Sequence, residues 1–386
     1  MDRYNIIKSD VKKNGRILEF SPYYRPLFPK SEGYDVDIVD VCDRKTLIER
    51  AKGNPNIEDY SKIEEVDYIC ASNYAETIGK KNEYDYVVAS HVIEHTTDII
   101  QFLADCADML KDDGIIKLFI PDKRYTFDYF REVTSTRIAI DRHMSSNKKI
   151  HSLGTVVEHD LRYCVIDVSR TDMPNSAFCY VDDLVLQNSN SNSMIYKIKE
   201  NILKFSDEKY IDVHSWIVTP KSFETMIYEL NILGFLKVYV DKIVTEDNNY
   251  EFYVELKKGK VDEADLDKRI QLYVERKKED FEEFEDMIEI ERLKKYFIEN
   301  PNTRVYIFGT GYGRFRIKRI LGYLLKDFYG YIVSDGKRIE KSIDGKPVFE
   351  LSEICNTEGN VVLVGTTMYK SEVMPGLLRR GFKCFF

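Results

Sequence analysis

The sequence predicts an α/β protein whose main domain is a doubly wound, mostly parallel β-sheet. Short apolar runs alternate with polar helical stretches between about residues 15 and 128. Strands that alternate with helices form βαβ units, and such units build parallel sheets. Farther along, residues 262–299 contain neither glycine nor proline, and a glycine-rich turn follows the next apolar run. Together these observations predict two α/β domains joined by a helix.

The composition is that of a globular protein, and it excludes several classes. The 386 residues are 43% hydrophobic and 32% charged, with a formal net charge of −9. Such an acidic balance argues against binding of nucleic acid through the overall field. No apolar run approaches the roughly 20 residues that a membrane span needs. Neither nucleic acid nor a membrane is therefore an expected partner.

Cysteine and histidine usage bears on the compartment and on metal binding. The seven cysteines include no C-x-x-C pair, which predicts reduced thiols and a cytoplasmic protein. The N-terminal residues contain no apolar signal-peptide segment. The cysteines and the six histidines never cluster at ligand spacing along the chain, so no metal site is predicted.

Five apolar runs are predicted to be strands of the first sheet. They are Arg16–Phe20, Val36–Val41, Val66–Cys70, Tyr84–Ala89 and Ile115–Ile120. Apolar side chains at helical spacing predict helices over Thr97–Leu110 and Ser222–Leu233. Two later strands, Leu236–Val240 and Tyr250–Leu256, would complete the same sheet.

The predicted domains follow from these elements. Residues 1–256 form the main domain, in which about residues 130–210 are inserted as a cap. Residues 257–300 are a helical linker, and residues 301–386 form a second, small α/β domain. The apolar stripe of the linker suits either a solvated connector or a dimerising coiled coil. Lys277 and Lys278 interrupt the stripe and favour the connector, while a homodimer remains an open expectation.

The segment Tyr84–Asp128 carries the most specific pattern. A strand ends at Ser90-His91, the pair Glu94-His95 follows one helical turn later, and the next strand ends at Pro121-Asp122. This composite resembles the later half of a class I S-adenosylmethionine-dependent methyltransferase. The resemblance implies a Rossmann-like sheet, S-adenosylmethionine as the cofactor and methyl transfer as the activity.

The strand ends give the expected cofactor site, because ligands of open α/β sheets bind beyond the carboxyl ends of the strands. Asp40 ends the second strand, where a carboxylate can accept hydrogen bonds from ribose hydroxyls. Glu19 is placed to meet the cofactor's ammonium group or a loop amide. The other residues expected to line the cofactor are Phe20, Ser21, Cys70, Ala71, Ser90 and His91.

The turn after the first strand departs from the E-x-G-x-G pattern of the family. It is Glu19-Phe-Ser21-Pro22-Tyr23, which predicts a rigid loop that leaves the cofactor less room. The stretches Pro29-Lys-Ser-Glu-Gly33 and Asp212-Val-His214-Ser-Trp216 resemble a subgroup of methyltransferase-like proteins from surface-polysaccharide clusters. This resemblance implies a sugar or nucleotide-sugar acceptor in glycan assembly. A non-catalytic scaffold that binds a nucleotide-sugar or a glycosyltransferase is the alternative.

Candidate catalytic residues for a hydroxyl acceptor are His214, Asp122 and His91. His214 lies on a predicted strand beside Trp216, the only tryptophan, whose indole can stack on a sugar face. A core contact between this histidine and tryptophan is the alternative. Arg124 and Tyr125 follow a strand end and are expected to contact the acceptor.

The small C-terminal domain carries a possible phosphate-binding turn. Gly309, Gly311 and Gly313 follow a predicted strand and precede a predicted helix, and Asp335 lies near the place of a ribose-binding acid. The domain resembles the small Rossmann-like modules attached to nucleotide-sugar enzymes. The resemblance implies a nucleotide ligand, although the glycines serve tight packing equally well. The small size of the domain disfavours an NAD(P)-dependent oxidoreductase.

Overall fold

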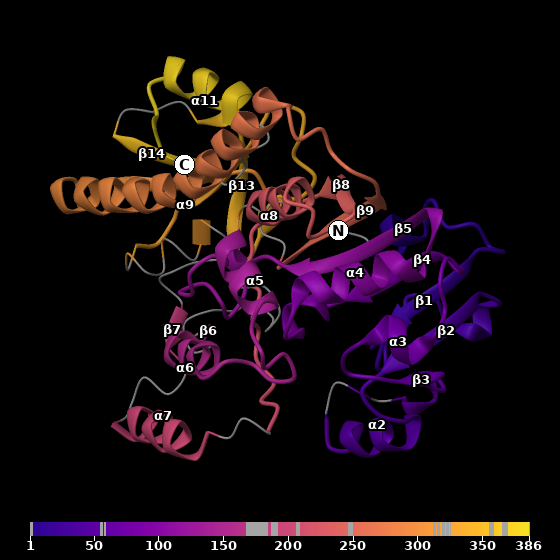
Figure 1. The fold of residues 1–386 in the computed structure, drawn as a ribbon. Coiled ribbons are helices and arrows are strands. Elements are labelled where there is room, and N and C mark those ends of the chain that lie inside the picture. The colour runs from indigo at the N-terminus through magenta and orange to yellow at the C-terminus, as the bar shows by residue number, and fades with distance from the viewer. Residues whose placement is uncertain are drawn as a thin grey trace. The chain divides into compact units, whose positions relative to one another are not determined.

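The computed structural model describes residues 3–54, 57, 59–166, 184–186, 192–205, 209–245, 250–311, 314, 317–318, 321, 324, 326–354, 359–364 and 370–385. The chain divides into two compact units. The first comprises Met1–Cys164 and Leu186–Arg276, and the second contains Lys277–Phe386. Each unit is built on its own mixed α/β sheet, rich in parallel strands (Figure 1). The predicted fold class is therefore confirmed.

The first unit holds a seven-stranded sheet in the order β3-β2-β1-β4-β5-β9-β8. The strands are β1 (Arg16–Phe20), β2 (Asp35–Asp40), β3 (Tyr68–Ile69), β4 (Tyr84–Ser90), β5 (Leu110–Pro121), β8 (Val238–Val244) and β9 (Glu251–Lys258). The first five run parallel, whereas β9 is antiparallel to both of its neighbours. The strand order reverses between β1 and β4, so the ligand crevice of such a sheet is expected at their carboxyl ends.

Helices cover both faces of this sheet. The helices of the first unit are α1 (Arg3–Lys8), α2 (Arg44–Ala51), α3 (Tyr74–Ile78), α4 (Ile99–Met109), α5 (Thr136–His143), α6 (Leu153–Arg162), α7 (Asn192–Lys204) and α8 (Pro220–Ile232). The apolar sides of α4 and α8 pack in one core with Leu18 and Phe20 of β1. On the opposite face, Ile17 of the same strand packs with Ile7 of α1. The alternation along β1 thus divides its side chains between two cores.

Short capping motifs fix the start of the two main helices. The Asp98 side chain accepts a hydrogen bond from the Gln101 amide at the start of α4. Thr219 and Ser222 form a reciprocal capping box at the start of α8, with Pro220 in its first turn. These are the residue types that satisfy the free amides of a helix N-terminus.

Each strand predicted for the first sheet has a counterpart in the structure, but the third is shortened to Tyr68–Ile69 and the strand predicted at Leu236–Val240 is Val238–Val244. The fifth begins at Leu110 directly after α4, not at Ile115. Residues 209–219, predicted to include a strand at Asp212–Trp216, are extended chain outside the sheet. Backbone hydrogen bonds hold them instead, from the Ser215 amide to the Glu94 carbonyl and from the Thr134 amide to the Ile217 carbonyl. The segment therefore lies against the β4–α4 connection, not beside a strand.

The second unit contains a six-stranded sheet in the order β12-β13-β11-β10-β14-β15. The strands are β10 (Arg304–Phe308), β11 (Gly330–Val333), β12 (Ser342–Ile343), β13 (Lys346–Glu350), β14 (Asn360–Val364) and β15 (Lys383–Phe385). All described pairs are parallel except β12 with β13. Helix α11 (Lys370–Arg379) belongs to this unit, and β6 (Cys164–Ile166) pairs with β7 (Leu184–Leu186) in a separate two-stranded sheet. The helix predicted for residues 316–325 lies mostly outside the described residues.

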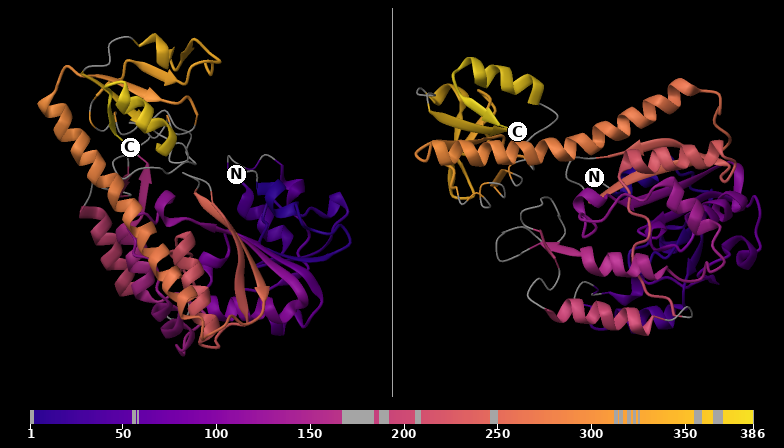
Figure 2. Two further views of the ribbon diagram at one scale, coloured as in Figure 1. Left: turned by 90° about the horizontal axis from the view of Figure 1, so that it is seen from above. Right: turned by 60° about the vertical axis from the view of Figure 1, so that its left-hand side comes forward.

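The predicted linker helix is present as α9 (Leu266–Glu299), whose 34 residues form one continuous helix (Figure 2). Its length is about 51 Å at the usual rise of an α-helix. Near its end, Ile290, Leu293 and Phe297 are buried in the core of the second unit. That part of α9 is a packed element and not the solvated connector expected. Among the described residues, no helix combines the length and apolarity needed to cross a membrane.

Candidate functional site

The carboxyl ends of β1, β2 and β3 meet at one edge of the first sheet. The Ser21 amide donates a hydrogen bond to the Val39 carbonyl (2.7 Å), and the Cys70 amide donates one to the Asp40 carbonyl (2.9 Å). These bonds continue the parallel ladders by one residue beyond the strands. Ser21, Asp40 and Cys70, which the sequence places at the cofactor edge, therefore lie on neighbouring strands.

The turn after β1 has the backbone shape of a glycine turn without the glycines. Ser21 has φ 45° and Tyr23 has φ 50°, both in the left-handed region. They occupy the two glycine positions of E-x-G-x-G, as counted from Glu19. A left-handed non-glycine residue costs about 1–2 kcal/mol, so surrounding contacts must hold this turn in place.

Glu19 provides one such set of contacts. Its carboxylate is buried and accepts hydrogen bonds from the amides of Leu27 (2.7 Å) and Phe28 (3.1 Å). Burial raises the pKa of Glu19 to about 7, although the two amides favour the charged form. Of the two roles expected for this residue, contact with a loop amide is the one present. Glu19 anchors the loop that follows β1.

Asp40 is buried at the end of β2. Its Oδ1 accepts the amide of Val41 at 2.7 Å. Burial raises the pKa of this carboxyl, opposed by the Val41 amide and the charge of Arg50. A carboxylate at this strand end has the position expected for a ribose ligand.

The other residues expected to line the cofactor differ in their surroundings. Phe20 is buried against Tyr74 and Phe102 in edge-to-face contacts, so its ring is core and does not face a ligand. Cys70 donates its thiol hydrogen to the Ser72 carbonyl. Ala71 lines a small pocket beside the start of α4. The full lining is Ala71, Ser72, Asn73, Tyr74, Thr96, Thr97, Asp98, Gln101, Phe102 and Lys148.

The end of β4 is a charged cluster. His91 Nε2 lies 2.7 Å from Glu251 Oε2, and its Nδ1 lies 3.4 Å from Glu94 Oε1. Burial disfavours the imidazolium, but the contacts with Glu251 and Glu94 outweigh it and raise the pKa of His91 to about 9. Arg3 donates to the Ser90 hydroxyl and pairs with Glu251. His91 is therefore cationic near neutral pH, which does not suit the general base predicted there.

Asp122 is another predicted catalytic residue, and its carboxylate forms an ion pair with Arg124. Its carboxylate takes a two-pronged contact from the Arg124 guanidinium, with Nη2 at 2.6 Å and Nε at 3.0 Å. It also accepts the Arg124 amide and so starts the 3₁₀ turn Lys123–Tyr125. The Cζ atom of the same guanidinium lies 5.4 Å from the centroid of the Tyr125 ring. This pairing fixes the loop after β5 and leaves Asp122 poorly placed to accept a substrate proton.

Trp216 is buried, and its predicted role as a sugar-stacking platform is corrected. The side chain is 4% exposed and belongs to the core that contains α4 and α8. Its Nε1 donates to the carbonyl and the hydroxyl oxygen of Thr96, at 2.7 Å and 3.0 Å. A core indole whose N–H is satisfied offers no face to a ligand.

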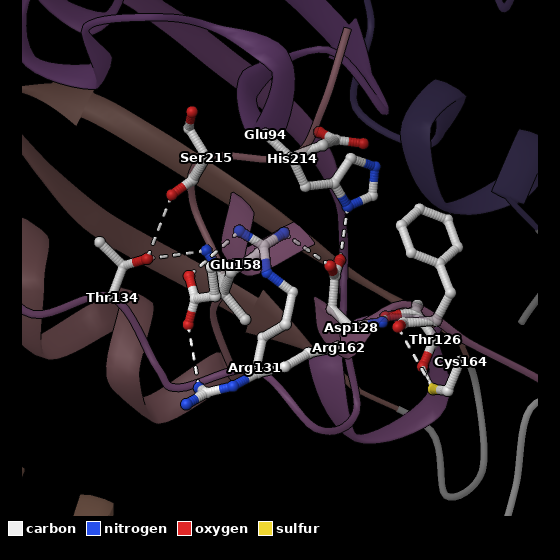
Figure 3. Close-up of polar contacts among 12 residues, drawn as sticks. Glu94, Thr126, Asp128, Arg131, Thr134, Glu158, Arg162, Cys164, His214 and Ser215 are labelled. Atoms are coloured by element: carbon white, nitrogen blue, oxygen red, sulfur yellow. Dashed lines mark hydrogen bonds and ion pairs between the residues drawn. The ribbon is translucent and has the colours of Figure 1, made fainter. Parts of the chain in front are cut away.

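His214 is held by a chain of charged side chains, of which Asp128 and Arg131 are buried (Figure 3). Its Nδ1 donates to Asp128 Oδ2 at 2.5 Å, and Arg131 Nη1 lies 2.8 Å from Asp128 Oδ1. Arg131 continues to Glu158 at 3.4 Å. Burial would raise the pKa of Asp128, but the His214 hydrogen bond and the Arg131 charge outweigh burial and lower it. Asp128 is thus ionised and fixes the orientation of the imidazole.

A second histidine–carboxylate pair lies against the first. His95 Nδ1 donates to Asp212 Oδ1 at 2.9 Å, and this contact is the main cause that lowers the pKa of Asp212 to about 2. The rings of His95 and His214 meet edge to face, with centroids 4.7 Å apart. Tyr210 donates to the His95 carbonyl and to Asp212. Both imidazoles have Nδ1 occupied and present Nε2.

Glu94 completes this cluster. It is 1% exposed, and within the described part of the chain neither carboxylate oxygen has a hydrogen-bond partner. Burial opposes its charge, but the contact with His91 and the imidazoles of His214 and His95 outweigh burial and lower its pKa. Sequence reasoning did not assign roles to Glu94, His95, Asp128 or Asp212, although the Glu94-His95 pair was part of the family pattern. The fold brings this pair to His214, more than a hundred positions away.

The predicted nucleotide turn of the second unit is described in part. Gly309 has φ 92°, and Gly313 lies outside the described residues. A groove at the ends of β10 and β11 is lined by Thr310, Arg314, Val333, Ile339, Glu340, Ser342, Ile343, Asp344 and Val348. Asp335 is not part of this lining; its Oδ1 accepts the Ser352 amide at 2.7 Å.

Comparison with known proteins matches part of the first unit to a protein family. Residues 8–158 match the family model of a methyltransferase domain. The match spans the five parallel strands of the first sheet and includes Asp40, Glu94, His95 and Asp128, but not Asp212 or His214. A search of the curated proteins gave no match for this chain.

Solved structures that match this chain include methyltransferases. A Pyrococcus horikoshii OT3 protein is 13% identical, over 66% of this chain and 86% of that chain, with a TM-score of 0.33. A SAM-dependent methyltransferase of Methanosarcina mazei is 12% identical, over 68% and 100%, with a TM-score of 0.34. The trans-methyltransferase CalH, in complex with SAH, is 20% identical over 31% and 35%, with a TM-score of 0.22. At these values the solved structures carry no argument about function, and only the match of residues 8–158 to the family model bears on it.

Proposed function

We propose that this protein transfers a methyl group from S-adenosylmethionine to a hydroxyl-bearing acceptor of the sugar class, in the assembly of a surface glycan. The match of residues 8–158 to a methyltransferase domain supports the reaction class. The observation that carries the proposal is the turn after β1, where Ser21 and Tyr23 keep left-handed backbone next to the buried Asp40. The turn has kept its shape although its sequence has lost the glycines.

An acceptor group and a small pocket at the cofactor edge support binding of S-adenosylmethionine. Asp40 would accept hydrogen bonds from the ribose hydroxyls, and the pocket at Ala71 and Phe102 would take the flat base. When bound, S-adenosylmethionine supplies an electrophilic methyl group. The chain's part is to hold the acceptor in line with it and to take the acceptor's proton.

The acceptor side is assigned to the histidine cluster. Asp212 and Asp128 hold His95 and His214 with Nε2 free of those carboxylates, so either imidazole can bind an acceptor hydroxyl. The cation of His91, fixed by Glu251, is a positioning group in this assignment. In the second unit, the groove that contains Thr310 and Arg314 is separately proposed to bind a nucleotide or nucleotide-sugar.

The test is formation of S-adenosylhomocysteine by the purified full chain with a panel of free sugars and nucleotide-sugars. His214→Gln should lower turnover by about 100-fold or more, as expected for loss of a proton-transfer group. Arg137→Gln is the control, because Arg137 is 76% exposed and contacts Asp141, outside both the cluster and the cofactor pocket.

Two outcomes contradict the proposal in different ways. Cofactor binding without turnover on any sugar would remove the sugar class. Absence of cofactor binding, together with binding of a nucleotide-sugar, would favour the non-catalytic scaffold.

A further inference from the structure

We propose that Glu94, His95 and His214 form a site for a divalent transition-metal ion. One ligand atom of each residue lies within 4.8 Å of those of the other two. The site goes beyond the proposed methyl transfer, which does not by itself require a metal. It rests on the acceptor site proposed above, because it uses the same His95 and His214; with an ion bound, their Nε2 atoms would be metal ligands and not proton acceptors.

Both imidazoles are presented as metal ligands usually are. Metal-binding histidines almost always donate the second ring N–H to a carboxylate, a carbonyl or water. Here Asp212 takes Nδ1 of His95 at 2.9 Å, and Asp128 takes Nδ1 of His214 at 2.5 Å. The nitrogens left for a ligand are the two Nε2 atoms, and Nε2 of His95 lies 3.9 Å from Glu94 Oε1.

Glu94 is the second, independent observation. Its side chain is 1% exposed, and neither oxygen has a hydrogen-bond partner among the residues that the structure describes. Its Oε1 lies 3.4 Å from His91 Nδ1, an ion pair that does not have hydrogen-bond geometry. A buried carboxylate that accepts no hydrogen bond is costly and rare in folded proteins. A metal ion between Glu94 and the two imidazoles would supply the missing partner.

The backbone holds the three residues in place. Glu94 and His95 belong to the 3₁₀ turn Ile93–His95 directly after β4. The Ser215 amide donates to the Glu94 carbonyl at 2.7 Å, so the residue next to His214 is fixed to Glu94 itself. Ligand atoms around a tetrahedral zinc ion lie roughly 3.3 Å apart. Closing the site would need each of the present separations, which are within 4.8 Å, to shorten to about that value.

The donor set selects the class of ion. Two imidazoles and one carboxylate suit Zn²⁺, Fe²⁺ or Mn²⁺, whereas Mg²⁺ and Ca²⁺ prefer all-oxygen sites. Three protein ligands leave a coordination position open, which is typical of catalytic sites and not of structural ones. The His95 side chain is 34% exposed, so an acceptor can reach that position. An acceptor hydroxyl bound there would release its proton to water more readily, since the cation would stabilise the alkoxide.

The test is a calorimetric titration of the chelator-treated full chain with Zn²⁺, with Mg²⁺ as the comparison ion. We expect one Zn²⁺ per chain and no measurable Mg²⁺ binding. His95→Ala should weaken Zn²⁺ binding by about 100-fold or more, and Asp212→Asn by about 10–100-fold, as for loss of an outer partner. His143→Ala, which removes a histidine outside the cluster, should leave the affinity unchanged. Co²⁺ should give the visible absorption of a four- or five-coordinate site.

Absence of Zn²⁺ uptake by the wild-type chain would overturn the proposal without any variant. So would uptake that His95→Ala and Glu94→Gln both leave unchanged. If Glu94→Gln fails to fold, the half-exposed His95 still provides the decisive variant. A parallel titration with S-adenosylmethionine keeps the two proposals distinguishable, because the cofactor edge does not include these ligands.

Discussion

Replacing Asp128 by Asn should destabilise the first unit far more than the loss of an ordinary surface charge. Asp128 is 2% exposed and contacts both His214, at 2.5 Å, and Arg131, at 2.8 Å. The substitution keeps the size of the side chain and one acceptor oxygen but removes the charge. Arg131, also 2% exposed, would then have only the weaker contact to Glu158 at 3.4 Å among its described ion pairs.

The magnitude follows from the cost of an uncompensated buried charge. Removing one partner of a buried ion pair costs about 3–5 kcal/mol. Because Asn keeps one acceptor, we expect a loss of about 3 kcal/mol in the free energy of unfolding. At about 1.4 kcal/mol per factor of ten, this corresponds to roughly a 100-fold larger unfolding constant.

Urea unfolding followed by the fluorescence of Trp216 measures this loss. Trp216 is the only tryptophan and is buried in the core of the first unit, so the signal reports on that unit. The control is Asp141→Asn, which breaks a pair with Arg137 whose side chains are 76% and 65% exposed. Its cost should stay below about 0.5 kcal/mol. A loss below about 1 kcal/mol for Asp128→Asn would refute the view that this carboxylate is a fixed, ionised anchor.

Three further predictions concern the predicted site residues. Ser21→Gly removes a side chain from a left-handed position and should raise the free energy of unfolding by up to about 1 kcal/mol in urea titrations; a loss would show that the hydroxyl makes a stabilising contact. Trp216→Phe should cost about 1–3 kcal/mol, read by circular dichroism, because the Thr96 carbonyl loses its donor. The pKa of His91 is raised from 6.5 to about 9, so its stabilising contribution is complete below pH 6.5 and disappears as the pH rises through 9. His91→Gln should flatten that decline in urea midpoints between pH 6.5 and 9, and an unchanged slope would contradict it.

The strands were predictable because their signal is local. A short, mainly apolar run that is buried on both faces, such as Ile17–Phe20 or Tyr86–Ala89, has few other places to lie in a globular domain. The cofactor edge followed from those strands, since parallel strands place their carboxyl ends together. The glycine-poor turn was harder, because the left-handed conformation at Ser21 and Tyr23 is a product of the surrounding fold and leaves no sequence signature.

The histidine cluster could not be predicted from spacing along the chain. Glu94 and His214 meet only because extended chain at residues 209–219 packs against the β4–α4 connection. Asp122 was misassigned for the opposite reason. In the sequence, a carboxylate at a strand end looks free to contact a substrate. In the structure, the guanidinium of Arg124, two residues along the chain, binds it.

The measurement that tests the account most directly is a calorimetric titration of the full chain with S-adenosylmethionine. We predict that the wild-type chain binds the cofactor and that Asp40→Ala weakens binding by about tenfold or more, as expected for lost hydrogen bonds to a charged group. Asp35→Ala, at the exposed opposite end of β2, should bind like the wild type. A wild-type chain that does not bind the cofactor, or an Asp40→Ala variant of unchanged affinity, would contradict the assignment of this sheet edge as the cofactor site.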